Sequence, residues 1–161
     1  MTDCSQALTF ARGPALKNRM MLAPLTNLQS HADGTLSDDE IHWLTMRAKG
    51  GFGLVMTAAA HVQRQGQGFP GQLGIWSDDH LPRLTELARK LREEGAVSSV
   101  QLHHAGMRSP RDLIGEAPQG PFEDAETGTR ALTTAEVEQL RDDFIAAAVR
   151  ADKAGFDGVE I

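Results

Sequence analysis

The sequence of 161 residues contains no tyrosine and a single cysteine, Cys4. One thiol builds neither a disulfide framework nor a zinc site made of cysteine ligands, which fits the reducing cytosol, so we expect a cytoplasmic protein. No apolar run approaches the ~20 residues that a membrane-spanning helix needs. The start of the chain has no basic residues followed by an apolar stretch, so we expect neither a signal peptide nor a membrane partner.

The sequence also lacks a block of basic residues. Its 16 Lys and Arg are outnumbered by 22 Asp and Glu, which gives a net charge of −6. A role in nucleic-acid binding therefore has no electrostatic support. Hydrophobic residues make up 40% and charged residues 24% of the chain, which indicates a globular protein rather than a disordered or collagen-like one.

Four short apolar runs alternate with helical patterns along the chain. The runs cover residues 18–24, 53–60, 97–103 and 155–161, and the second is almost continuously apolar or small. Such a run is typical of strands that are covered on both faces in a parallel sheet. Three helices are predicted between the runs: one after the capping-box pattern Ser37–Glu40, one over 79–94, and one from the capping box Thr133–Glu136 to Gly155.

This β-α alternation predicts parallel strands joined by right-handed helical crossovers, in a doubly wound sheet or a closed barrel. The first strand ends in Ala23-Pro24-Leu25-Thr26, without the glycines of a dinucleotide-binding loop. A (β/α)8 TIM barrel needs ~250 residues, so we expect this chain to supply about four βα units. Two long connections, 63–78 and 107–132, follow strands and are expected to be functional, the alternative being exposed insertions.

Five segments, in this order and with these gaps, resemble the Old Yellow Enzyme family of FMN-dependent ene-reductases and NADH:flavin oxidoreductases. They are KNRMMLAPLT (17–26), RAKGGFGLVMTAAAHV (47–62), LGIWSDDH (73–80), VQLHHAG (100–106) and AGFDGVEI (154–161). The resemblance implies that residues 1–161 form the N-terminal half of an FMN-binding TIM barrel and end in its fourth strand. FMN would then bind at the carboxyl ends of the strands.

The resemblance assigns the end of the first strand to the flavin. The backbone of Ala23, Pro24 and Leu25 is expected to lie along the isoalloxazine ring. The hydroxyl of Thr26 is expected near the O4/N5 edge, where a donor stabilises one charge state of the flavin and so tunes its redox potential.

Two further positions are implied to bind FMN. The backbone of Ala58 would meet the flavin, although a run of alanines is equally compatible with tight core packing. Gln101 lies within an apolar run, where an unsatisfied buried amide costs ~1–3 kcal/mol. The flavin pyrimidine would satisfy this amide, and the alternative partner is a carbonyl of a neighbouring strand.

Leu28, Trp76 and His104 are expected at the substrate pocket. Leu28 stands where many members carry a tyrosine, so the hydrogen bond of that tyrosine to substrate is lost or replaced. Trp76 is expected either near the mouth of the site or as an anchor for its loop, and His104 as a structural histidine in the pocket wall. Neighbouring residues on a strand face opposite sides, so His103 and His104 do not share a metal ion, and we expect no metal site.

The resemblance places the catalytic groups outside this chain. A histidine pair that holds the substrate oxygen and a tyrosine that supplies the proton would follow Ile161, so no catalytic residue is expected here apart from Thr26 as the redox tuner. The implied reaction transfers hydride from NADH or NADPH to FMN, and then to the β-carbon of an activated alkene such as an enone or nitroalkene.

An open half-barrel exposes the edges of its first and fourth strands. We therefore expect a C-terminal half-barrel or a second copy as partner. The competing interpretation is an inactive half-barrel fragment that acts as a self-associating or partner-requiring structural module. A different phosphate-binding barrel enzyme is disfavoured, because no lysine or carboxylate pair lies at the strand ends.

Overall fold

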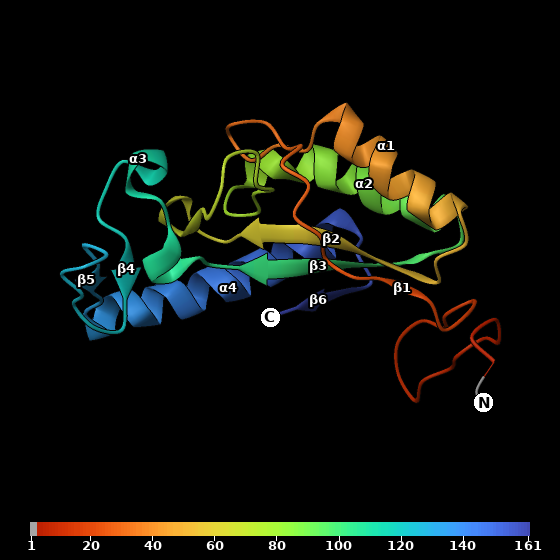
Figure 1. Cartoon of the computed structure of the whole chain (residues 1–161). Coiled ribbons are helices and arrows are strands. Elements are labelled where there is room, and N and C mark those ends of the chain that lie inside the picture. The colour runs from red at the N-terminus through yellow and green to blue at the C-terminus, as the bar shows by residue number, and fades with distance from the viewer. Residues whose placement is uncertain (1–2) are drawn as a thin grey trace.

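Four parallel strands form the sheet at the centre of the molecule, in the order β1-β2-β3-β6 (Figure 1). The structure is a computed structural model that describes residues 3–161. The strands are β1 (Met21–Leu22), β2 (Leu54–His61), β3 (Val97–His103) and β6 (Gly158–Glu160). All four strands predicted from the sequence are present and all pair in parallel, so this part of the prediction is confirmed.

Three helices cover one face of this sheet. They are α1 (Asp38–Lys49), α2 (Leu81–Glu93) and α4 (Thr134–Ala154). In Figure 1, α1 and α2 lie together over the sheet and α4 passes behind it, and the helices contact β2, β3 and β6. The core between helices and strands is formed by completely buried side chains, among them Leu44, Val55, Leu84, Leu87, Leu91, Val100 and Ala147.

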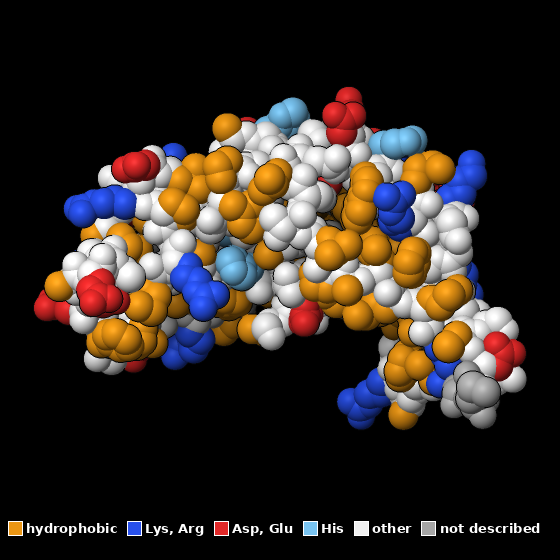
Figure 2. Space-filling view, viewed as in Figure 1, with side chains coloured by type: hydrophobic (Ala, Val, Ile, Leu, Met, Phe, Trp, Pro, Cys, Tyr) orange, Lys and Arg blue, Asp and Glu red, His pale blue; other side chains and the backbone are white. Residues whose placement is uncertain are grey.

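The opposite face of the sheet carries no helix within residues 3–161. Figure 2 shows hydrophobic side chains gathered on the face in front of the strands. Exposed apolar residues on this side and just beyond β1 include Met21, Leu25 and Leu28. This open face is the interior of a barrel that these four strands begin.

The long connections extend from the carboxyl ends of the strands, as the sequence predicts. After β2 the chain forms the short 3-10 helices η1 (Arg64–Gly66) and η2 (Asp78–His80). After β3 it forms η3 (Gly106–Arg108), α3 (Arg111–Ile114), β4 (Gln119–Gly120) and β5 (Arg130–Ala131). The arrows of β2 and β3 point toward α3, β4 and β5 in Figure 1, whereas the amino-terminal segment lies at the other end of the sheet.

The two helices that are predicted to start with a capping box both have a side-chain cap, but only α4 has the complete box. The Thr133 hydroxyl accepts a hydrogen bond from the Glu136 backbone N–H, and the Glu136 carboxylate accepts one from the Thr133 backbone N–H at 2.8 Å. Ser37 likewise accepts from the Glu40 backbone N–H at 3.1 Å. The side chain of Glu40, however, turns into the protein and is completely buried, so the second half of the predicted box is wrong there.

Replacement of Thr133 by alanine is expected to lower the free energy of unfolding by about 1 kcal/mol, because the cap of α4 is lost. Thr134 is the matched control, since its side chain is exposed and makes no hydrogen bond within residues 3–161. Its alanine variant is expected to change stability by less than about 0.5 kcal/mol. Urea unfolding of both variants measures the difference, and equal effects would contradict a capping role.

The helix α4 is apolar on two sides. Its inner side buries Ala147 and Ala151 in the core, whereas Ile145 and Val149 on the outer side are exposed. These outer residues, together with Ile161, line an apolar groove of about 620 Å³. Within the described residues, neither this helix nor any other is long and apolar enough to cross a membrane.

Candidate active site at the strand ends

The open face of β3 carries polar side chains. Val100 and Leu102 belong to the core beneath the helices, so the alternate residues Ser99, Gln101 and His103 point to the open face. Gln101 and His103 are half-buried, and both lie at the carboxyl end of the strand. An amide and an imidazole are therefore presented side by side at the mouth of the incomplete barrel.

The neighbouring strand β2 contributes a small residue and a second histidine. Ala59 pairs with Gln101 and His61 pairs with His103, and paired residues of parallel strands point to the same face. The register is irregular between Met56 and Ala59, and the intervening Ala58 is 3% exposed. The residue beside Gln101 is thus Ala59, which sequence reasoning missed, because the bulge that interrupts the alternation has no signal in a run of alanines.

The end of β1 offers unpaired polar groups. Ala23, Leu25 and Thr26 are exposed and Pro24 is half-buried. Within residues 3–161, neither Leu25 nor Thr26 makes a backbone hydrogen bond, and the Thr26 hydroxyl has no partner. The proline at 24 lacks an N–H and ends the strand pairing, which leaves the following backbone free to bind a ligand.

The loop after Thr26 is held in a strained conformation. Leu28 has a φ of 58° and is the one non-glycine residue with positive φ in the described part of the chain. Such a conformation costs about 1–2 kcal/mol for a non-glycine residue. A backbone hydrogen bond ties this loop to the connection that follows β2: the Ser30 N–H donates to the Gly71 carbonyl at 3.1 Å. The same connection bridges to β2 between Gly74 and His61. The Leu28 side chain remains 60% exposed.

A buried carboxylate holds the same loop from the other side. Glu40 accepts hydrogen bonds from the Ser30 hydroxyl and from Asn27 Nδ2, the latter at 3.0 Å. Burial raises the pKa of Glu40, while the two hydrogen bonds act in the opposite direction. Glu40 therefore ties the first turn of α1 to both ends of the segment that carries Leu28.

Gln101 has a polar partner within the sheet. Its Nε2 donates to the Glu160 carboxylate at 2.8 Å, so its partner is a side chain of β6 rather than the strand carbonyl considered as the alternative. The Gln101 Oε1 makes no hydrogen bond within residues 3–161. Half of this amide is thus available to a ligand on the open face.

His61 is the most deeply buried histidine on this face. Its Nδ1–H donates to the Gln63 carbonyl at 2.8 Å, so the neutral ring has no proton on Nε2, and this buried atom has no partner in the described structure. Desolvation lowers the pKa of His61 to about 4. The lowered pKa favours the uncharged ring at neutral pH, whose one N–H is used by the Gln63 carbonyl.

Trp76 and His104 lie apart from this open face. Trp76 packs edge-on against His80 with ring centroids 5.2 Å apart, and the guanidinium of Arg64 lies 5.9 Å from its ring. Trp76 lines a cavity of about 340 Å³ together with Gln139 and Asp143 of α4. This placement supports the loop-anchor interpretation over a position at the pocket mouth.

His104 packs within the loop connections. Its Nδ1 accepts from the Gly106 backbone N–H at 3.0 Å, and a Cβ on Gly66 would lie 2.3 Å from its Cδ2. Burial is the main cause that lowers the pKa of His104. Within residues 3–161, no group of three or more His, Cys, Asp or Glu side chains is arranged to hold a metal ion.

The open face therefore combines free backbone groups, the Thr26 hydroxyl, the Gln101 amide and the small side chain of Ala59. Such a donor and acceptor set fits a flat heterocycle with polar edges. The sheet has four parallel strands with helices on one side, and this site lies at the carboxyl ends of the strands. This arrangement defines the class of protein as part of a cofactor-binding (β/α)8 barrel.

The model of the NADH:flavin oxidoreductase / NADH oxidase family matches residues 8–161, and the chain belongs to this family. The relatives include the "Probable NADH-dependent flavin oxidoreductase YqiG" of Bacillus subtilis, 39% identical over 160 residues, which cover 97% of this chain and 43% of the relative. A NADPH dehydrogenase of Geobacillus thermodenitrificans is 39% identical over 155 residues, or 93% of this chain and 45% of the relative.

Solved structures agree with this assignment. The Old Yellow Enzyme homologue of Zymomonas mobilis superimposes with a TM-score of 0.89 at 29% identity, over 98% of this chain and 47% of that protein. The chain thus spans less than half the length of the relatives that it matches. The predicted family, the TIM-barrel class with about four βα units here, and the cofactor class of FMN with NADH or NADPH are confirmed.

Proposed function

We propose that this chain forms one side of the FMN site of an NAD(P)H-dependent oxidoreductase that reduces activated alkenes. The observation that carries the proposal is the set of unpaired polar groups at the mouth of the sheet, from Leu25 and Thr26 beyond β1 to Gln101 on β3. In sheets of this kind, ligands bind at the carboxyl ends of the strands.

The residues of this face fit FMN. The backbone of Ala23, Pro24 and Leu25 is exposed beyond β1 and would lie along the flavin ring. The Thr26 hydroxyl would donate to the ring edge and stabilise negative charge there, and Gln101 would bind the pyrimidine. The small side chains of Ala58 and Ala59 leave the ring room to approach. When bound, FMN supplies the hydride transfer from NADH or NADPH to the alkene.

For the substrate side of the site, we propose one direct contact from this chain. Leu28 is exposed in the strained loop after Thr26 and would present an apolar contact to the alkene. We place Trp76 and His104 outside direct substrate contact, as supports of the loops. The cytoplasmic location predicted from the sequence stays a prediction.

We propose that residues 1–161 act as the N-terminal half of one barrel domain, with a C-terminal half as partner. The exposed groove of α4 and the edge of β6 would be covered by that half. A second copy of this chain would be the competing partner. Analytical ultracentrifugation, with and without the C-terminal half of a relative, distinguishes the two, and a homodimer that ignores the added half would contradict this proposal.

Replacement of Gln101 by alanine is expected to weaken FMN binding about fivefold, because the hydrogen bond that its free Oε1 would make to the flavin, worth about 1 kcal/mol, is lost. The matched control is Gln139→Ala, since Gln139 lies on α4 and donates to Asp143 away from the open face. Flavin fluorescence quenching measures both affinities in the assembled barrel. Equal affinities of the two variants would contradict the assigned role of Gln101.

The alternative function is an inactive structural module. A colourless protein that fails to take up FMN even with the C-terminal half present would support it. We expect instead that FMN uptake needs the added half, and that the chain alone reduces neither enones nor nitroalkenes, since it has no tyrosine to supply the proton. Turnover by the chain alone would contradict this expectation.

A further inference from the structure

Glu40 is a completely buried carboxylate near the start of α1. It forms no ion pair within residues 3–161. A buried carboxylate without a cation is costly unless its oxygens accept hydrogen bonds. Here Oε1 accepts from Asn27 Nδ2 at 3.0 Å, and Oε2 accepts from the Ser30 hydroxyl. These two donors offset the cost of burial, and the carboxylate in turn fixes the position of both.

Asn27 connects this carboxylate to the end of β1. Its Oδ1 accepts from the Gln29 backbone N–H at 3.2 Å, while its Nδ2 donates to Glu40. The reversed amide would place its NH2 group against the Gln29 N–H, so the backbone determines the amide orientation. Thr26 directly precedes Asn27, and its hydroxyl and backbone N–H have no partner within residues 3–161. The position of Thr26 therefore depends on Asn27 rather than on contacts of its own.

The segment between the two donors contains Leu28, whose φ is 58°. A left-handed conformation is unfavourable for leucine and persists only where the surrounding contacts hold it. From the connection after β2, Gly71 approaches so closely that a Cβ there would lie 2.6 Å from the Leu28 carbonyl oxygen. From α1, Glu40 binds Asn27 before Leu28 and Ser30 after it. The segment is therefore fixed between this connection and the first turn of α1.

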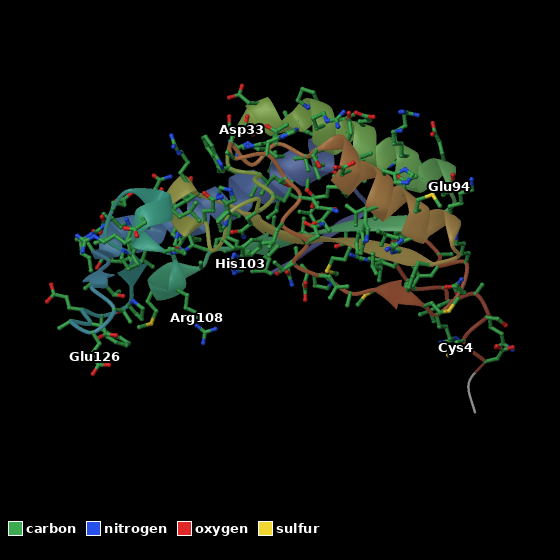
Figure 3. The ribbon with its side chains drawn as sticks, turned by 45° about the horizontal axis from the view of Figure 1, so that its top comes forward. Cys4, Asp33, Glu94, His103, Arg108 and Glu126 are labelled. Carbon is green, nitrogen blue, oxygen red and sulfur yellow. The ribbon has the colours of Figure 1, made fainter. Side chains whose placement is uncertain are left out.

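The contacts of Glu40 lie at the end of the sheet where the flavin site is proposed. In Figure 3, Asp33, in the loop that leads into α1, is at the same end of the sheet as His103, whereas Glu94 is at the opposite end. Helix α1 begins at Asp38, so its first turn lies toward the carboxyl ends of the strands. A residue of the helix layer thus reaches the loop that carries Thr26.

We propose that Glu40 is a positioning residue for the flavin site, and that it holds the Thr26 hydroxyl in place through Asn27. The proposal rests on the proposed function, in which this hydroxyl donates to the edge of the flavin ring. Because Glu40 is completely buried, it acts through its two hydrogen-bond partners rather than on the ligand itself. Its contribution comes from geometry and not from its charge.

The variants Glu40→Gln and Glu40→Met form a matched pair for the test. In Glu40→Gln, Oε1 still accepts from Asn27, and Nε2 donates to the Ser30 hydroxyl, which also serves as an acceptor. In Glu40→Met, a side chain of similar length makes neither hydrogen bond. If Glu40→Met fails to fold, Asn27→Ala removes the same contact at a half-buried residue.

The first measurement needs no flavin. NMR of leucine-labelled protein, in the assembled barrel without FMN, reports the φ of Leu28 through its intraresidue NOE between HN and Hα, which is strong at positive φ. We expect Glu40→Gln to retain the strong NOE of the wild type, and Glu40→Met and Asn27→Ala to weaken it. An unchanged Leu28 in the last two variants would overturn the proposal, whether or not the protein binds FMN.

The second measurement is the reduction potential of bound FMN. In Glu40→Met and Asn27→Ala, displacement of the Thr26 hydroxyl is expected to weaken the binding of reduced flavin about tenfold relative to oxidised flavin. This change lowers the potential by about 30 mV. Glu40→Gln is expected to change the same ratio by less than about twofold. A charge effect would have the opposite sign, because removal of a buried anion favours the anionic reduced flavin.

The potentials separate positioning from the other roles of Glu40. A potential that changes as much in Glu40→Gln as in Glu40→Met, or that rises in Glu40→Gln, would overturn the proposal. So would an unchanged potential in Glu40→Met, which is the result of a merely structural role. Wild-type protein that takes up no FMN would instead count against the proposed function, and the NMR measurement would still decide whether Glu40 fixes the Leu28 segment.

Discussion

Replacement of Gly71 by alanine is expected to lower the free energy of unfolding by about 2–4 kcal/mol. Gly71 has a φ of +68°, and a Cβ there would lie 2.6 Å from the Leu28 carbonyl oxygen and 2.8 Å from its carbon. The left-handed conformation costs an alanine about 1 kcal/mol. The contact is with backbone atoms of a loop that is already strained, so it is relieved only by moving that loop.

Gly95 provides a matched control for this variant. It has nearly the same φ of +67°, and a Cβ there would meet nothing within 4 Å. Gly95→Ala is therefore expected to cost only the conformational part, about 1 kcal/mol. Urea unfolding of the two variants isolates the contact with Leu28, and equal losses would show that the close approach has no energetic consequence.

The same variant is expected to affect the flavin site. Moving the Leu28 carbonyl also moves Thr26, two residues earlier, so FMN affinity in the assembled barrel is expected to fall in Gly71→Ala. Gly95 lies between α2 and the start of β3, at the opposite end of the strand from the site, and its variant is expected to bind FMN normally. Equal FMN affinities of the Gly71→Ala and Gly95→Ala variants would show that the stability of this loop does not affect cofactor binding.

Acidification from pH 7 to pH 4 is expected to lower the free energy of unfolding by about 3 kcal/mol through His61 alone. Burial lowers the pKa of His61 from 6.5 to about 4 in the folded state, and its side chain is 2% exposed. The unfolded chain therefore binds a proton at a higher pH than the folded one. The stabilisation is complete above pH 6.5 and is lost as the pH falls through the window down to about 4.

The variant His61→Asn tests this assignment. Its side-chain amide keeps a donor for the Gln63 carbonyl but does not titrate, so the slope of stability against pH is expected to flatten between pH 6.5 and 4. Glu40 acts with the opposite sign, because its raised pKa makes the folded state bind a proton more readily as the pH falls. Glu40→Gln is therefore expected to steepen the slope, and an unchanged slope in His61→Asn would contradict the role of His61.

Local sequence signals predicted the helices and strands well, because helix caps and helix ends depend on residues that are close together in the chain. The hydroxyl of Thr133 and the carboxylate of Glu136 are three residues apart, and both capping bonds form as expected. Gly155 ends α4 with a φ of 90°, as a glycine after a helical pattern indicates. The start of α2 was placed too early, since residues Asp78–His80 form a 3-10 turn that leads into it.

The site was predicted less completely, because its residues depend on contacts between distant segments. Glu40 has the spacing of a capping residue, but Asn27 and Ser30 draw its carboxylate into the protein. Ala59 rather than Ala58 lies beside Gln101, because a bulge shifts the register of β2. The sequence assigned no role to Gln72. Its hydrogen-bond partner His103 lies 31 residues further along the chain, and no local pattern indicates a contact over that separation.

The sequence by itself determined the order of strands and helices, the family, and the strand end around Thr26 that the family assigns to FMN. Periodicity and capping act within a few residues, so they can be read from the printed chain. Only the tertiary structure decided which face of β3 is open, which alanine lies beside Gln101, and which partners the Gln72 amide bonds. Those properties depend on register and on hydrogen bonds between separate strands and loops, and a linear pattern does not specify either.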